Sequence, residues 1–143
     1  MRKGYVALIA VFAFALLAGS CSAHVTGGGF IPDHYGDGTA NFGFNINCDG
    51  PDDSKGQVTY HDKSTALRAK GTVTVCLDGA AFGTWTPQGK SSWVGGTFWV
   101  TAVDNGEPGT ADTFTIDLYQ GGLSPVYSNS GTLLGGNIQS HDD

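Results

Sequence analysis

The chain contains 143 residues, 23 of them glycine, and carries a formal net charge of −6. An acidic chain without a cluster of Lys and Arg repels a phosphate backbone, so this composition argues against nucleic-acid binding. Glycine, proline and asparagine recur along the whole length, which disfavours long helices and predicts an all-β protein.

The first residues have the layout of a cleaved export signal. Two basic residues precede an apolar run at 6–17, which is too short for a permanent membrane-spanning helix. Cleavage before Cys21 would remove a signal peptide of residues 1–20 and leave a lipoprotein anchored through acyl chains on that cysteine. Cleavage that removes 1–23 would instead release a secreted protein beginning at His24. We expect the lipid anchor, and both cuts predict an extracytoplasmic location in the cell envelope, on the outer surface or beyond it.

Three cysteines are an odd number for an exported chain. If Cys21 is acylated, Cys48 and Cys76 remain, and an oxidising compartment favours a disulfide between them. Strict strand alternation places Cys48 on an apolar face, with Phe44 and Ile46. The same alternation places Cys76 on a polar face, with Thr72 and Thr74. The predicted disulfide therefore requires a bulge or a strand end.

Apolar residues alternate with polar ones at 41–47, 71–75, 97–103 and 113–119, and turn signals lie between these runs. This pattern is typical of antiparallel sheets. Residues 66–70 fit a helical turn or a strand equally well. We predict one domain over 25–141, a single antiparallel β-sandwich that is Ig-like or jelly-roll-like. Its expected core is Phe42, Phe44, Ile46, Val58, Tyr60, Val73, Val75, Phe98, Val100, Phe114, Ile116 and Leu118.

Six short motifs occur in order along the chain: HVTGGGFI (24–31), ANFGFN (40–45), KGQVTY (55–60), VDNGEPG (103–109), DTF (112–114) and LGGNIQ (134–139). Together they resemble the post-choice-of-anchor-P domain of bacterial exported surface proteins. The resemblance implies an exported β-sandwich module whose molecular function is unassigned, and it brings no catalytic residues with it.

Three tryptophans are candidate ligand-binding residues, because a sugar ring stacks on a flat aromatic face. Trp99 lies on the polar side of its run, between Thr97 and Thr101, which favours exposure. Trp85 and Trp93 are the other members of the expected carbohydrate platform. The alternative is that these aromatic side chains pack at the edge of the core.

The loop after 97–103 concentrates oxygen atoms of the kind that Ca²⁺ binds, from Asp104, Asn105, Glu107 and Asp112. The spacing does not match an EF-hand. The alternative is a hairpin connection in which Asp and Asn close local turns. Ca²⁺ is therefore an optional ligand, and no other resident cofactor is predicted.

The histidines give a remote alternative. If the chain begins at His24, its amine and imidazole could chelate copper with a second histidine, as in copper-dependent polysaccharide monooxygenases. His34 and His61 lie in turn-like contexts and are expected at the surface. The sequence contains no nucleophile elbow, P-loop or zinc motif, so we do not expect an enzyme.

These observations predict a non-catalytic surface module, exported or lipid-anchored, for adhesion, display or ligand binding. The expected partners are a membrane, through Cys21, and a polysaccharide or another surface protein. A structural β-domain stabilised by Ca²⁺ is the alternative, and a copper oxidase that uses His24 is the remote one.

Overall fold

The computed structural model describes residues 23–48, 54–77, 79–89 and 92–142, so the predicted signal peptide and Cys21 lie outside the described residues. The described part consists of strands and two short 3₁₀ turns. The strands are β1 (Ala23–Pro32), β2 (Thr39–Cys48), β3 (Ser54–Asp62), β4 (Leu67–Leu77), β5 (Ala80–Pro87), β6 (Gly96–Val103), β7 (Thr113–Leu118), β8 (Tyr127–Thr132) and β9 (Gly135–Asp142), and the turns are η1 (Lys63–Thr65) and η2 (Gly109–Ala111).

These strands form one antiparallel sheet in the order β8-β7-β6-β5-β4-β3-β2-β1-β9. Each strand from β1 to β8 pairs with its sequence neighbour, and β9 returns to pair with β1. The all-β prediction is confirmed. Residues 66–70, which the sequence left open between helix and strand, lie mostly in β4.

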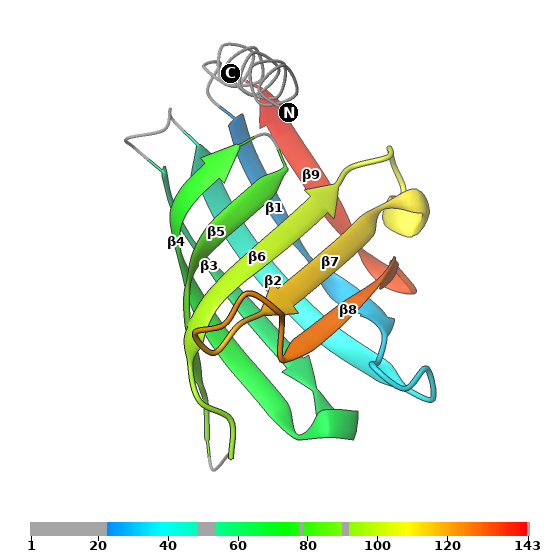
Figure 1. Cartoon of the computed structure of the whole chain (residues 1–143). Coiled ribbons are helices and arrows are strands. Elements are labelled where there is room, and N and C mark those ends of the chain that lie inside the picture. Colours follow the sequence, from blue (N-terminus) through cyan, green and yellow to red (C-terminus); the bar gives the residue numbers. More distant parts are fainter. Residues whose placement is uncertain (1–22, 49–53, 78, 90–91, 143) are drawn as a thin grey trace, which may run out of the picture.

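The sheet curls so that β4 to β8 face β1, β2, β3 and β9 across a common interior (Figure 1). The edge strand β8 reaches the end of β1, which lies next to the other edge strand, β9. There the Asn129 side chain donates to the Pro32 carbonyl at 2.9 Å, and the Leu134 amide donates to the Phe30 carbonyl at 2.8 Å. A sandwich of two separate sheets, Ig-like or jelly-roll-like, is therefore not confirmed. Apolar and polar residues alternate in the same way in two stacked sheets and in one curled sheet. The alternation therefore could not distinguish these two architectures.

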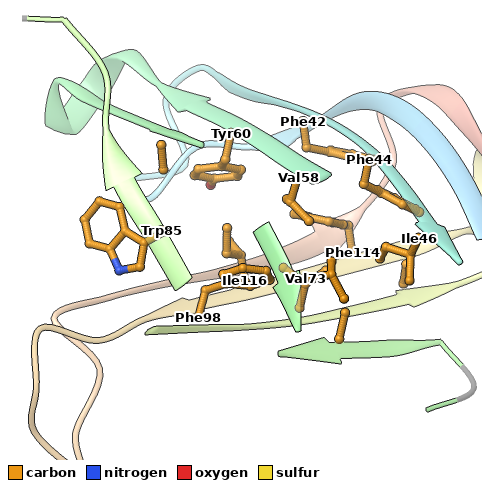
Figure 2. Close-up of a cluster of buried hydrophobic side chains, with 14 of the residues drawn as sticks. Phe42, Phe44, Ile46, Val58, Tyr60, Val73, Trp85, Phe98, Phe114 and Ile116 are labelled. Atoms are coloured by element: carbon orange, nitrogen blue, oxygen red, sulfur yellow. The ribbon is translucent and has the colours of Figure 1, made fainter. Parts of the chain in front are cut away.

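Aromatic rings from the two halves of the curl meet in the interior (Figure 2). Phe114 of β7 is fully buried and stacks on Phe42 of β2 with ring centroids 4.1 Å apart. The rings of Phe44 and Tyr60 also stack near Phe114, with centroids 6.0 and 6.2 Å from that of Phe114. These contacts join strands that are far apart in the sheet and hold the curl closed.

A β-bulge in β4 decides which side chains of that strand point inward. The register shifts between Val73 and Val75, so the next inward residue is Cys76. Val75 is 43 % exposed, which corrects its predicted place in the core, whereas the other predicted core residues are buried. The same shift brings Cys76 to Cys48, and the predicted disulfide between them is confirmed, with Cα atoms 5.7 Å apart.

Candidate binding grooves on the outer face

The interior of the curled sheet holds little empty space beside Trp85. A cavity of about 10 Å³ lies between Val58, Gly71, Trp85 and Phe98. This volume is that of a single water at most. The larger grooves among the described residues lie on the outer face.

A groove of about 470 Å³ crosses the outer face of β4, β5 and β6, extends to the segment that follows β7, and holds Trp99. The Trp99 side chain is 38 % exposed. Its Nε1 atom donates to Thr101 Oγ1 at 3.0 Å, and its ring packs nearly perpendicular to Phe82 with centroids 3.8 Å apart. The groove is lined by Thr74, Phe82, Gly83, Thr84, Thr97, Phe98, Trp99, Tyr119, Gly122 and Leu123. The indole is thus fixed in orientation while much of its surface stays open to solvent.

Strand register explains why hydroxyl groups surround this indole. Thr72, Thr84 and Thr97 are successive partners on β4, β5 and β6, and the Tyr119 amide donates to the Thr97 carbonyl. Because cross-strand partners share a face, these side chains form a row beside Trp99. The sequence analysis found Trp99 but missed Phe82, Tyr119 and Leu123, because their proximity depends on pairing.

The other two tryptophans do not join Trp99. Trp85 is only 2 % exposed, and its Nε1 atom donates to the Tyr119 carbonyl at 3.0 Å, so its predicted role in ligand binding is corrected to a core role. Trp93 is half-buried, packs its ring edge-on to Tyr127 and donates to the Thr65 carbonyl at 3.3 Å. The three side chains therefore do not form a common platform.

The carboxylates of the predicted calcium loop point to backbone amides. Asp112 is buried and accepts from the amides of Asn105 at 2.7 Å and Ile138 at 2.8 Å. Asp104 accepts from the amides of Gly106 and Ser140, each at 3.0 Å. These hydrogen bonds hold the pKa of Asp104 below its ordinary value.

The remaining members of the loop are engaged as well. Glu107 accepts from the side chains of Asn137 at 3.1 Å and Gln139 at 3.4 Å, and the Asn105 side chain donates to the Ala111 carbonyl at 2.8 Å. Within the described ranges, no three His, Cys, Asp or Glu side chains are grouped so that they could hold a metal ion. The observed arrangement fits the alternative of a hydrogen-bonded connection between β6 and β7.

A buried polar network that the sequence analysis missed lies at the end of the sheet where β3 turns into β4. Asp62 is fully buried and caps η1. Its Oδ1 atom accepts from the Ser64 amide at 2.9 Å and the Ser64 hydroxyl at 2.6 Å. Its Oδ2 atom accepts from the His34 amide at 3.0 Å and the Tyr127 hydroxyl at 2.6 Å. One carboxylate thus joins three segments of the chain.

The network continues from Tyr127 through two more side chains. Asn129 donates to the Tyr60 hydroxyl at 2.8 Å, and the Tyr60 and Tyr127 hydroxyls lie 2.6 Å apart. Since Tyr127 donates to Asp62, its oxygen is free to accept from Tyr60, which gives a continuous relay from Asn129 to Asp62. The Tyr60 and Tyr127 hydroxyls thus both have hydrogen-bond partners inside the protein.

Burial and hydrogen bonds set the pKa values of Asp62, Tyr60 and Tyr127. Burial raises the pKa of Asp62, but the hydrogen bonds from Ser64, Tyr127 and His34 outweigh it and leave the pKa below its ordinary value. Burial is the main cause that raises the pKa of Tyr60 to about 12, and it likewise raises that of Tyr127. The carboxylate is therefore charged and both phenols are neutral near neutral pH.

His24 lies in β1 opposite His141 of β9, with ring centroids 5.6 Å apart. The His24 Nε2 atom is 2.8 Å from Asn45 Oδ1, and the His141 Nε2 atom is 3.2 Å from Thr26 Oγ1. A second histidine thus lies beside His24, but copper binding stays a prediction.

Comparison with known proteins adds no relative. The sequence matches no protein-family profile, and searches of curated proteins and of solved structures find no match. The resemblance to the post-choice-of-anchor-P domain therefore stays a prediction. No helix in the described part of the chain is long and apolar enough to cross a lipid bilayer.

Proposed function

We propose that this chain is a non-catalytic surface module that binds a polysaccharide through the outer groove around Trp99. The observation that carries the proposal is the half-open indole in a groove of about 470 Å³, fixed by Thr101 and Phe82. Pockets that combine apolar surface with a few placed polar groups are the usual form of a ligand site.

The chemistry of the groove suits a sugar. The C–H face of a pyranose ring is apolar and packs on an aromatic face, and its hydroxyl rim needs hydrogen-bond partners. Trp99 and Phe82 supply the first, while Thr84 and Thr97 supply the second. An indole already held in place loses little side-chain entropy on binding, which favours affinity.

Export and anchoring complete the proposal. Residues 1–20 act as a signal peptide, and acylation of Cys21 holds the module at the cell envelope, where polysaccharides and other surface proteins are the accessible partners. Intact-mass measurement of the membrane fraction, wild type beside Cys21→Ala, tests this. Lipid mass on wild type alone supports the anchor, and a soluble species that begins at His24 contradicts it.

The binding test uses a glycan array followed by titration of the best polysaccharide. Trp99→Ala should weaken binding on the order of tenfold to a hundredfold, since a central tryptophan commonly dominates an interface. Tyr35→Ala is the control, because Tyr35 is an exposed aromatic outside this groove. Equal binding by wild type and Trp99→Ala would contradict the proposed function.

The structural alternative has its own readout. If the module serves as a β-domain stabilised by Ca²⁺, Ca²⁺ should raise its melting temperature and EDTA should reverse the rise. The engagement of Asp104, Glu107 and Asp112 with N–H donors gives Ca²⁺ no evident advantage. An oxidase activity that depends on added copper would instead favour the remote alternative at His24.

A further inference from the structure

A second groove, of about 510 Å³, lies on the outer face of β2, β3 and β4 and has a different chemical character. Arg68 and Lys70 of β4 line it, together with His61 and Thr59 of β3 and Asn41 of β2. No Asp or Glu is among its lining residues. The groove is therefore cationic on a chain whose net charge is −6.

Strand alternation puts the two cations of this groove on one face, and sheet register places polar side chains of β3 beside them. Arg68 and Lys70 are two residues apart on β4, so both point outward, and both are exposed. Their direct partners on β3 are His61 and Thr59. Burial lowers the pKa of His61, and the positive charges of Arg68 and Lys63 lower it further, whereas the charge of Asp62 raises it.

No carboxylate neutralises the groove among the described residues. Neither Arg68 nor Lys70 forms an ion pair in that part of the chain. The nearest acid in sequence, Asp62, points inward and is engaged by Ser64, His34 and Tyr127. Two exposed cations are thus left with their donors free for an external anion.

The outer face of β4 connects this groove to that of Trp99. Arg68, Lys70, Thr72 and Thr74 alternate along β4, all exposed. The first two line the cationic groove, and Thr74 lines the groove around Trp99. A ligand long enough to lie along β4 would touch both, which favours a polymer over a small anion.

We propose that the groove formed by Asn41, Thr59, His61, Arg68 and Lys70 binds the carboxylate groups of an acidic polysaccharide. The Arg68 guanidinium presents paired N–H donors that match a carboxylate, and Lys70 adds a second charge beside it. The exposed large apolar side chains lie outside the groove lining, so the site lacks the anchors that a lipid surface would use. This inference rests on the proposed function and adds the ligand class: a glycan that carries uronic acids.

The test measures binding of polygalacturonate and alginate to the purified exported chain, with fully methyl-esterified polygalacturonate as the uncharged match. Wild type should bind the acidic polymers at least roughly tenfold more tightly than the ester. Arg68→Gln with Lys70→Gln should remove that preference. Lys55→Gln is the charge control, because Lys55 is exposed on the same face but outside this groove. Both variants should keep the wild-type melting temperature.

The outcomes separate this inference from the proposed function. If Trp99→Ala weakens binding of every polymer while the Arg68 and Lys70 variant loses only the preference for acid, both proposals stand. If Trp99→Ala binds normally and only the Arg68 and Lys70 variant loses the preference, the proposed function fails at Trp99. The further inference is overturned if neither acidic polymer is preferred or if the variant retains the preference. It is also overturned if inorganic phosphate or vesicles with anionic lipid bind with the same dependence on Arg68.

Discussion

The inward and outward sides of this one sheet differ in how completely the chain supplies the partners of its side chains. Inside, Phe114 stacks on Phe42, and Asp62 receives four hydrogen bonds from protein groups. Outside, Trp99 is partly open and the described residues give Arg68 and Lys70 no ion pair.

This difference indicates that the inner side chains determine stability and that the outer side chains are available for binding. A buried polar group without a partner would cost stability, and the buried carboxylate of Asp62 receives all of its donors from the protein. An exposed polar or aromatic group costs little when unpartnered, because water serves it until a ligand replaces the water. Substitutions on the inner side should therefore change folding, and those on the outer side should change binding.

The largest effect is expected at Phe114. Phe114→Ala should lower the free energy of unfolding by about 3–5 kcal/mol, because it removes the ring on which the two halves of the curl meet. Denaturant unfolding followed by circular dichroism measures the loss. Phe30→Ala is the matched control, since Phe30 is a partly exposed phenylalanine whose removal should cost roughly 1 kcal/mol or less. Equal losses would show that the interior is not the main source of stability.

The disulfide should come next. Reduction, or Cys48→Ala with Cys76→Ala, should lower the free energy of unfolding by about 3.5 kcal/mol through the entropy of the unfolded chain. Thiol labelling under denaturing, non-reducing conditions should find neither cysteine free. An unfolding curve that does not move when reductant is added would contradict the expected contribution.

A smaller loss is expected at Asp62. Asp62→Asn should cost about 1–3 kcal/mol, because the amide nitrogen faces donors that the carboxylate oxygen had satisfied. Asp37→Asn, at an exposed aspartate in the β1–β2 turn, is the control and should be nearly neutral. The measurement is again unfolding by denaturant at neutral pH.

Asp62 also gives stability a defined dependence on pH. Its pKa in the folded protein lies below the ordinary value of 3.8, so its charged form stabilises the fold at pH values above 3.8. That contribution is lost as the pH falls through the folded-state pKa. Asp62→Asn should therefore lose less stability than wild type between pH 5 and pH 2. Parallel acid titrations of wild type and Asp62→Asn would contradict this.

Local alternation was enough to predict the all-β fold, most of the core and the exposure of Trp99. It also contained the signal for Trp85, because Trp85 shares a face with Ala81 and Gly83, which are buried, while Thr84 and Thr86 point outward. The predicted carbohydrate platform nevertheless included Trp85, because tryptophan is a residue type that stacks on sugars.

Alternation failed where the backbone breaks its own period. The bulge between Val73 and Val75 exposes Val75, a predicted core residue, and turns Cys76 inward. No residue type in β4 indicates a bulge at this position. The relay from Asn129 to Asp62 joins residues 65 to 69 positions apart, and the Asn129–Pro32 contact that closes the sheet joins residues 97 positions apart. Such contacts follow from the curl of the whole sheet and leave no local pattern.

The smallest effect on stability is expected at Trp99. Trp99→Ala should lower the free energy of unfolding by roughly 1 kcal/mol or less, because the indole is partly solvated and its loss leaves no closed cavity. Trp85→Ala removes the same side chain from the interior and should cost about 3–5 kcal/mol. Measured side by side with polysaccharide titrations, the two variants should separate: Trp99→Ala folded but binding weakly, Trp85→Ala destabilised. If Trp99→Ala proved as unstable as Trp85→Ala, its loss of binding would be explained by unfolding. The outer side chains would then contribute to stability as much as the inner ones, which would contradict the comparison.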